Sequence, residues 1–195
     1  MELNYKNNKL LISLKESYRM LYNAFIWYRK GTGISYAEEA KLVVSYCKYP
    51  PEGERGACPF VRCNDYGTGD RKGCYEKANK EVAVSVIIEG IEGVNNMEEI
   101  IAVPGIDTIS VGNVDLSVAL GVPGQVFHPL VKQAVIDCAN LCEKYGKSCS
   151  AQIVNPEDVN LFKDYKGISH YHTDMPATIL YKAYKSLCDQ IHESV

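Results

Sequence analysis

One segment, Val82 to Ile88, constrains the fold of this chain more than any other. It is an apolar run rich in β-branched residues, interrupted only by Ser85. Such a run is typical of a strand buried on both faces of a parallel sheet, because a half-exposed strand would alternate apolar and polar residues. Parallel strands need a crossover connection between them, so the segment predicts an α/β fold.

The rest of the chain supports this prediction, because strand and helix patterns alternate after the run. The spacing of apolar residues predicts, in order, helix 95–102, strand 107–112, helix 129–145, strand 148–153, helix 156–163, strand 167–172 and helix 176–192. No low-complexity stretch or linker divides the sequence, so we expect one α/β domain.

Upstream of the apolar run the patterns are less regular. Apolar spacing over residues 8–27 predicts a helix, and the capping-box pattern at 35–38 predicts a second helix over about 36–47. Between Pro50 and about Gly73 the chain is rich in Gly, Pro, Asn and Asp and shows no periodicity. A loop of that length in a compact domain is usually functional or disordered.

Composition argues against several kinds of partner and location. The 195 residues carry 21 Lys and Arg against 24 Asp and Glu, and no basic run favours nucleic acid or an anionic membrane. No apolar stretch approaches the roughly 20 residues of a transmembrane helix, and the N-terminal apolar run is too short for a secretory signal. Eight cysteines without a C-x-x-C pair are typical of reduced thiols. We therefore expect a cytoplasmic protein.

Two α/β architectures fit the alternation, an open doubly wound sheet and a closed (β/α)8 barrel. Neither a G-x-G-x-x-G fingerprint nor a P-loop follows any predicted strand, which argues against the commonest nucleotide-binding forms of the open sheet. A complete barrel typically needs about 250 residues, more than the chain has. Periodicity alone leaves both architectures open.

Two acidic residues follow predicted strands, where α/β proteins place their sites. Glu89 comes directly after the apolar run, and Asp115 lies just beyond strand 107–112. The carboxyl ends of parallel strands meet at one edge of a sheet, so two carboxylates there can share a hard divalent cation such as Mg²⁺. In the alternative interpretation, Asp115 caps a helix and Glu89 is solvated. Glu92 is a rival ligand.

Three stretches of the chain resemble a known family. They are AEEAKLVVSYCKYPPEGERG at 37–56, IIEGIEGVNNMEEIIAVPGIDTISVGNVDLSVALGVPGQ at 87–125, and the HP pair at 128–129. They are similar to the HpcH/HpaI aldolase/citrate lyase family, metal-dependent (class II) pyruvate aldolases on a (β/α)8 barrel. The resemblance implies an α/β fold of the TIM-barrel type that is N-terminally incomplete, with about five of eight βα units. Residues 1–35 would be a divergent segment and residues 36–195 the barrel portion.

The resemblance also implies a carbon–carbon lyase that cleaves a 4-hydroxy-2-oxoacid into pyruvate and an aldehyde through a metal-stabilised enolate. Mg²⁺ or Mn²⁺ would be held by the two strand-end carboxylates, Glu89 and Asp115. Backbone N–H groups of the following turn would bind the substrate carboxylate. The residues of that turn are Gly112, Asn113, Val114 and Asp115.

A further catalytic candidate is Arg55, which the resemblance places on the PPxGxRG loop near the mouth of the site. Its alternative role is that of a structural loop arginine. The family also favours assembly into oligomers, so the resemblance implies a homo-oligomer that acts on a small-molecule 2-oxoacid.

The chain departs from the family pattern at several positions. Residues 1–35 contain no counterpart of the histidine that assists proton transfer or of the arginine that holds pyruvate. Ile87 stands where these aldolases often have Gln, and Asn113 stands where Pro is usual. Two alternatives therefore stay open. One is a truncated paralogue that binds metal or a partner without turnover, and the other is chemistry like that of citrate lyase or citrate synthase.

Strand 167–172 carries two histidines, His170 and His172, which alternate and therefore share one face. They are ligands in one interpretation and structural histidines in the other. His172 and Arg55 are the local candidates to replace the missing family groups. Asp174 resembles the acidic residue that follows the family's last strand.

Overall fold

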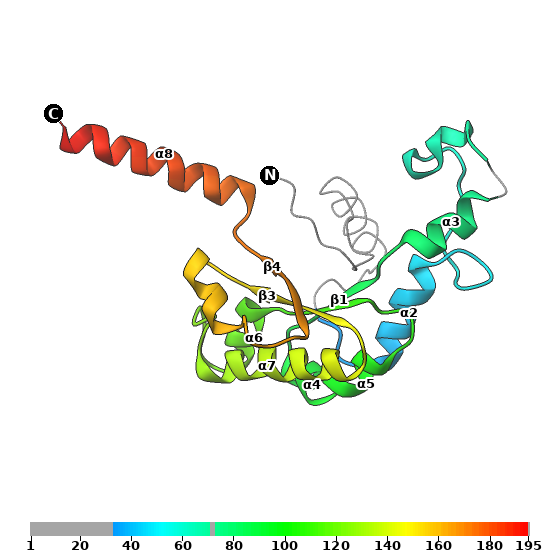
Figure 1. The fold of residues 1–195 in the computed structure, drawn as a ribbon, viewed down its shortest axis with the longest axis horizontal. Coiled ribbons are helices and arrows are strands. Elements are labelled where there is room, and N and C mark those ends of the chain that lie inside the picture. Colours follow the sequence, from blue (N-terminus) through cyan, green and yellow to red (C-terminus); the bar gives the residue numbers. More distant parts are fainter. Residues whose placement is uncertain (1–32, 71–72, 195) are drawn as a thin grey trace.

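The computed structural model describes residues 33–70 and 73–194, and it confirms an α/β chain built on a parallel sheet (Figure 1). In these residues four strands form the sheet: β1 (Ser85–Ile88), β2 (Thr108–Val111), β3 (Ser148–Gln152) and β4 (Ile168–His172). The α-helices are α2 (Ala37–Cys47), α3 (Cys74–Glu81), α4 (Ile91–Asn95), α5 (Met97–Ala102), α6 (Asn113–Ala119), α7 (Pro129–Lys144) and α8 (Pro176–Glu193). Two 3-10 helices are η1 (Arg62–Gly67) and η2 (Pro156–Leu161).

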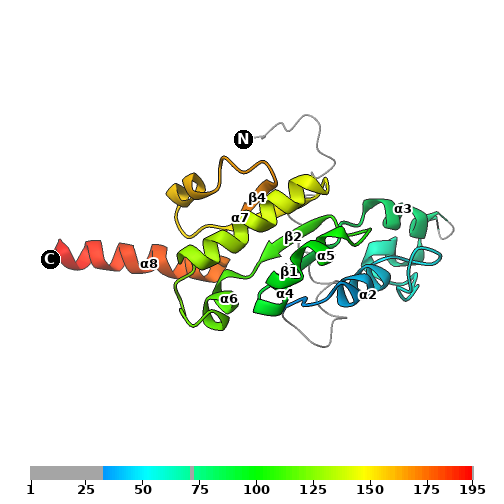
Figure 2. The ribbon, with the colours of Figure 1, turned by 90° about the horizontal axis from the view of Figure 1, so that it is seen from below.

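The strands are parallel and lie in the order β1-β2-β3-β4, which is also their order along the chain. Crossovers between parallel strands are right-handed, so the helices that connect successive neighbours lie on one side of the sheet. Figures 1 and 2 show α4, α5, α6 and α7 on that side.

The helix-covered face of the sheet holds the apolar core. Fully burying a Val, Leu or Ile side chain contributes about 1.5–3 kcal/mol, so this layer anchors the helices to the sheet. Its buried side chains include Val84, Val86, Ile88, Ile100, Ile109, Val111, Val131, Val135, Cys138, Cys149 and Ala151.

The opposite face of the sheet is largely polar. In β1, Val86 and Ile88 are buried on the helix side, whereas Ser85 and Ile87 on the other side are only half-buried. The prediction that this strand is buried on both faces is therefore wrong for the described residues. On the polar face the hydroxyls of Ser110 and Ser150 form a hydrogen bond between β2 and β3.

Several helix boundaries differ from those predicted. The helices predicted over 36–47, 129–145 and 176–192 are confirmed as α2, α7 and α8. The predicted helix 156–163 is the 3-10 helix η2, and α3 and η1 form where no helix was predicted. Glu39 rather than Glu38 accepts a hydrogen bond from the Ser35 N–H (2.8 Å), so the first turn of α2 is set one residue later than expected. The helix predicted over 8–27 lies outside the described residues.

Seven cysteines have no disulfide partner in the described part of the chain. They are Cys47, Cys58, Cys74, Cys138, Cys142, Cys149 and Cys188. Within the same residues, every helix is too short or too polar to span a lipid bilayer.

Candidate functional site

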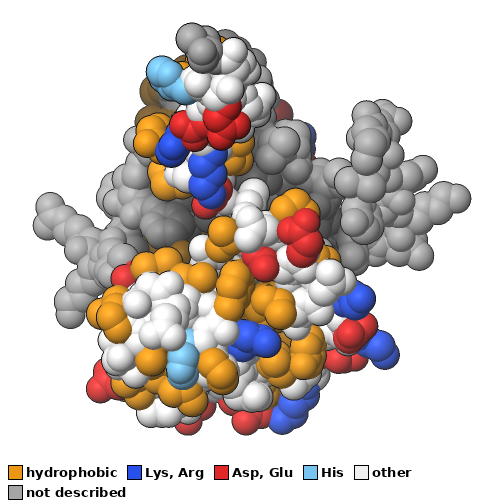
Figure 3. Space-filling model, turned by 90° about the vertical axis from the view of Figure 1, so that its left-hand side faces the viewer, with side chains coloured by type: hydrophobic (Ala, Val, Ile, Leu, Met, Phe, Trp, Pro, Cys, Tyr) orange, Lys and Arg blue, Asp and Glu red, His pale blue; other side chains and the backbone are white. Residues whose placement is uncertain are grey.

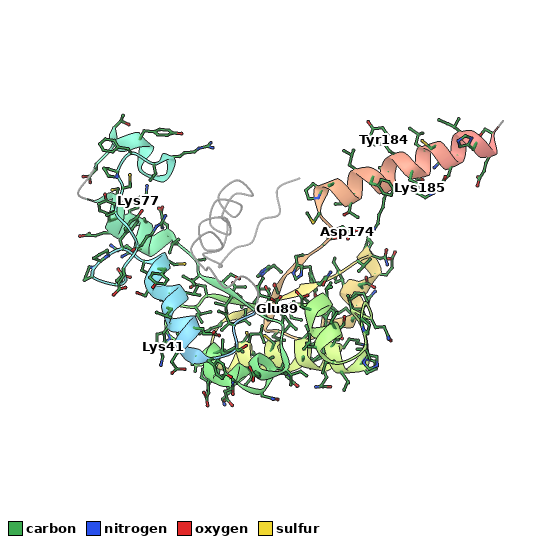
Figure 4. All side chains as sticks on the ribbon, turned by 180° about the vertical axis from the view of Figure 1, so that it is seen from behind. Lys41, Lys77, Glu89, Asp174, Tyr184 and Lys185 are labelled. Atoms are coloured by element: carbon green, nitrogen blue, oxygen red, sulfur yellow. The ribbon has the colours of Figure 1, made fainter. Side chains whose placement is uncertain are left out.

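Glu89 lies directly after β1, at the carboxyl edge of the sheet (Figure 4). Its side chain fits between two glycines from different parts of the chain. A Cβ atom on Gly112 would lie 2.7 Å from Oε2 of Glu89, and a Cβ atom on Gly33 would lie 3.0 Å from its Cγ. Both glycines therefore make the space that the carboxylate occupies.

Backbone hydrogen bonds hold both glycines in place. The Ile34 N–H donates to the Ile87 carbonyl (2.8 Å), and the Gly112 N–H donates to the Ile88 carbonyl (2.9 Å). Between these segments Oε1 of Glu89 is buried. Burying a carboxylate is costly unless a cation or hydrogen-bond donors compensate it.

Asp115 lies in the first turn of α6, which begins immediately after Gly112. The first hydrogen bond of the helix closes on the Gly112 carbonyl (2.9 Å). The N–H groups of Asn113, Val114 and Asp115 therefore have no hydrogen-bond acceptor within the helix. Asp115 and Val114 are exposed. Because Gly112 also contacts Glu89, the structure brings the Asp115 turn to the Glu89 edge.

Asn113 and Ser117 hold the loop that follows α6. Asn113 is 1% exposed, and its amide donates to the Val126 carbonyl (3.1 Å). Its Oδ1 is buried without a hydrogen-bond partner among the described residues. The Ser117 hydroxyl donates to the Val114 carbonyl (2.6 Å) and accepts from the Gly124 N–H (3.0 Å). The Asn113 position, where the resembled family has Pro, is thus integrated into the turn by burial and a hydrogen bond.

Arg55 lies toward the other end of β1. Its N–H donates to the Lys48 carbonyl (2.9 Å), and its guanidinium lies 4.6 Å from the centre of the Tyr49 ring. The Lys48 ammonium in turn donates to the Val82 carbonyl (3.2 Å), just before β1 begins. Glu89 follows the end of β1. Within one chain, the structure does not bring Arg55 and Glu89 together.

Two other acidic candidates have partners elsewhere. Glu92 is exposed on α4, and its charge and its hydrogen bond to the Tyr36 hydroxyl raise the pKa of Tyr36. Asp174, which is labelled in Figure 4, lies at the foot of α8. It forms an ion pair with Lys182. Neither contact places these carboxylates beside Glu89.

The donor chemistry at the Glu89 edge fits a hard divalent cation. Across residues 33–70 and 73–194, no group of three or more His, Cys, Asp and Glu side chains is placed to hold a metal. Mg²⁺ usually takes one or two protein carboxylates and completes its shell with water and substrate oxygens. Glu89 and Asp115 are the two carboxylates that the sequence predicts as such ligands, and both lie on segments that meet at Gly112.

The last two strands add polar side chains, of which the sequence pattern predicts only some. The register pairs Ser150 with His170 and Gln152 with His172. Burial lowers the pKa of His170, and burial followed by repulsion from His170 lowers the pKa of His172. Both imidazoles are therefore neutral at pH 7. The shared face of the histidines was predicted, but Gln152 was missed because only strand pairing places it beside His172.

Comparison with known proteins gives a consistent result. A model of the HpcH/HpaI aldolase/citrate lyase family matches residues 33–159. The 5-keto-4-deoxy-D-glucarate aldolases of Escherichia coli (strain K12) and Shigella boydii serotype 18 are 40% and 39% identical to the chain over 110 residues. Each alignment covers 56% of this chain and 42% of the relative, so the chain spans less than half the length of these curated relatives.

Solved structures agree with this match. An HpcH/HpaI aldolase from Desulfitobacterium hafniense DCB-2 has a TM-score of 0.69 and 25% identity, and the match covers 81% of this chain and 61% of that chain. An HpcH/HpaI aldolase/citrate lyase family protein from Burkholderia cenocepacia J2315 has a TM-score of 0.73 and 25% identity, with 82% and 62% covered. The four-stranded sheet is thus part of a TIM-barrel-type aldolase fold, and it matches about three fifths of each neighbour.

Proposed function

The chain belongs to the HpcH/HpaI aldolase/citrate lyase family, and from this membership we propose that it is a carbon–carbon lyase of the aldolase type. Its substrate would be a small 4-hydroxy-2-oxoacid, cleaved into pyruvate and an aldehyde. The observation that carries this proposal is the position of Glu89, held between Gly33 and Gly112 at the carboxyl edge of the sheet. Sites of (β/α)8 enzymes lie at that edge.

In the proposed site Glu89 and Asp115 hold Mg²⁺ or Mn²⁺. When bound, the cation would supply Lewis-acid stabilisation of the negative charge that develops on the 2-oxoacid. The N–H groups of Asn113, Val114 and Asp115, at the start of α6, would bind and orient the substrate carboxylate. The close packing at Gly112 and Gly33 would hold the Glu89 carboxylate in one position at this edge.

We further propose that the protein works as a homo-oligomer in the cytoplasm. The free thiols support a reducing compartment, because exported proteins tend to pair their cysteines. Exposed apolar side chains on α8 support self-association.

The proposed activity is tested with purified protein, Mn²⁺ and two reactions. Decarboxylation of oxaloacetate needs little beyond a cation that holds a 2-oxoacid, so we expect it to be metal-dependent and lost in Glu89→Ala. Exchange of the pyruvate methyl protons, followed by NMR, demands more of the site, and we expect it to be weaker. Equal rates in the wild-type and Glu89→Ala proteins would contradict a lyase site at Glu89.

The second candidate is a family member that binds a cation without turnover. The position of Arg55 favours it, because an arginine that offsets enolate charge would have to stand at the Glu89 edge. Losing one such preorganised donor typically costs about 10²- to 10³-fold in rate. Mn²⁺ binding that depends on Glu89, with neither reaction above background, would support this candidate.

A further inference from the structure

We propose that Gln152 and His172 form the far wall of the Glu89 site, and that His172 is the group that accepts the proton of the substrate's 4-hydroxyl. This inference deepens the proposed function and rests on it. The sequence offers His172 only as a local candidate for a missing family group, and the register of β4 now gives it a position and a specific step.

The argument begins with the strand register. Ile88 pairs with Val111, Ser110 with Ser150, and Gln152 with His172. Continuing each ladder by one or two residues aligns four residues in one row across the sheet, and we call this the rim row. Its members, in the order of the strands, are Glu89, Gly112, Gln152 and His172.

The members of the rim row share one face of the sheet. Directly paired residues in a sheet point to the same side, and alternate residues along a strand do as well. Cys149 and Ala151 are buried in the core on the helix side, so Gln152 and His172 lie on the opposite, polar side. Glu89 follows the buried Ile88 and contacts Gly112, which places it on that side too.

The spacing of the row suits a small substrate. Three strand intervals of about 4.8 Å separate Glu89 from His172, or about 14 Å along the sheet. The second member, Gly112, has no side chain, and the carboxylate of Glu89 occupies the space that a Cβ atom there would take, so Glu89 leans along the row toward Gln152. A carboxylate and an imidazole that extend toward each other from the ends of the row can contact opposite ends of one 4-hydroxy-2-oxoacid.

The chemistry of the two ends is complementary. Glu89 lies at the end that would hold the carboxylate and keto oxygens, which leaves the 4-hydroxyl toward His172. Partial burial lowers the pKa of His172, so its imidazole is mainly neutral at pH 7 and has a free nitrogen that can take up the proton. In the proposed step the 4-hydroxyl O–H bond breaks and its proton moves to the imidazole. The O–H electron pair forms the aldehyde C=O, the C3–C4 bond breaks, and its electron pair passes into the pyruvate enolate.

His170 is a natural control for this assignment. It lies one row lower, opposite Ser150, and its Nδ1 is 2.9 Å from the Ser169 hydroxyl. It is therefore of the same residue type and on the same face as His172, but further from the edge that carries Glu89.

The placement is tested by NMR with Mn²⁺ added to the full chain. Paramagnetic broadening falls with the sixth power of distance, so we expect the imidazole signal of His172 to broaden well before that of His192 on α8. The broadening should disappear in Glu89→Ala. If Mn²⁺ binding depends on Glu89 but His172 broadens no more than His192, the far-wall assignment is overturned and the metal site stands. If no Mn²⁺ binding depends on Glu89, the proposed function fails first.

The chemical role is tested by cleavage of 4-hydroxy-2-oxopentanoate with Mn²⁺. A general base typically contributes 10²- to 10⁴-fold, so we expect His172→Gln to lower cleavage at least about 100-fold relative to oxaloacetate decarboxylation, which has no hydroxyl proton to remove. His170→Gln should leave this ratio within about threefold. Equal losses in the two variants, or none in His172→Gln, would overturn the assigned role.

Discussion

At the level of single residues, the proposed metal site depends on the carboxylates of Glu89 and Asp115. If they are the protein ligands, removing either one loses a charge-assisted contact to the cation. We expect Glu89→Ala or Asp115→Ala to weaken Mn²⁺ binding at least about tenfold by titration calorimetry. Glu92→Ala is the matched control, because Glu92 is acidic and close in sequence but faces Tyr36. Unchanged affinity in both ligand variants would reject the site.

A substitution at Gly112 tests the same site by displacing Glu89 without removing a ligand. A methyl group there would lie 2.7 Å from both Cβ and Oε2 of Glu89, so the carboxylate must move in Gly112→Ala. We expect Mn²⁺ binding to weaken about tenfold or more, while the protein stays folded by circular dichroism. Gly90→Ala is the control, because its Cβ would meet nothing within 4 Å. Equal effects of the two substitutions would show that the fit around Glu89 is not what binds metal.

At the level of elements, apolar spacing predicted the helices and strands that bury one apolar side in the core. α7 and β2 bury one side against each other and were found near their predicted positions. α3 buries only Asn79 and has no apolar stripe, so no periodicity could reveal it. The same limit applies to the site. Glu89 and Asp115 can be picked out from the sequence because they lie just after predicted strands. Gln152 can be assigned to the site only from its pairing with His172.

The packing of the residue just before β4 against α7 depends on one glycine. A Cβ atom on Gly167 would lie 1.9 Å from the backbone carbonyl oxygen of Ala139, in the middle of α7. Since backbone cannot give way as a side chain does, we expect Gly167→Ala to lower the free energy of unfolding by at least about 1–3 kcal/mol. In Gly56→Ala the Cβ would be in open space, and the change should stay within about 0.5 kcal/mol. Urea denaturation compares the two, and equal midpoints would contradict this close packing.

At the scale of the whole molecule, α8 stands out because its large apolar side chains are exposed in the described part of the chain. The helix projects from the body of the protein, and in the described structure none of its residues is buried (Figures 1 and 3). Its exposed apolar side chains are Ile179, Leu180, Tyr181, Tyr184, Leu187 and Ile191. An exposed apolar patch of this kind usually marks an interaction surface. Four of these side chains, Leu180, Tyr184, Leu187 and Ile191, follow helical spacing and form one stripe.

We therefore expect a dimer or larger assembly at micromolar concentration, with the α8 stripe inside the interface. Leu180→Glu combined with Leu187→Glu would place two charges in that interface, and burying unpaired charges is costly, so the assembly should dissociate toward monomer in sedimentation velocity. Ser186→Glu adds a charge to the same helix outside the stripe and should leave the assembly intact. A wild-type protein that sediments as a monomer would remove the basis for self-association through α8. If Ser186→Glu dissociates the assembly as much as the double variant, charge on the helix, and not burial of the stripe, would be the cause.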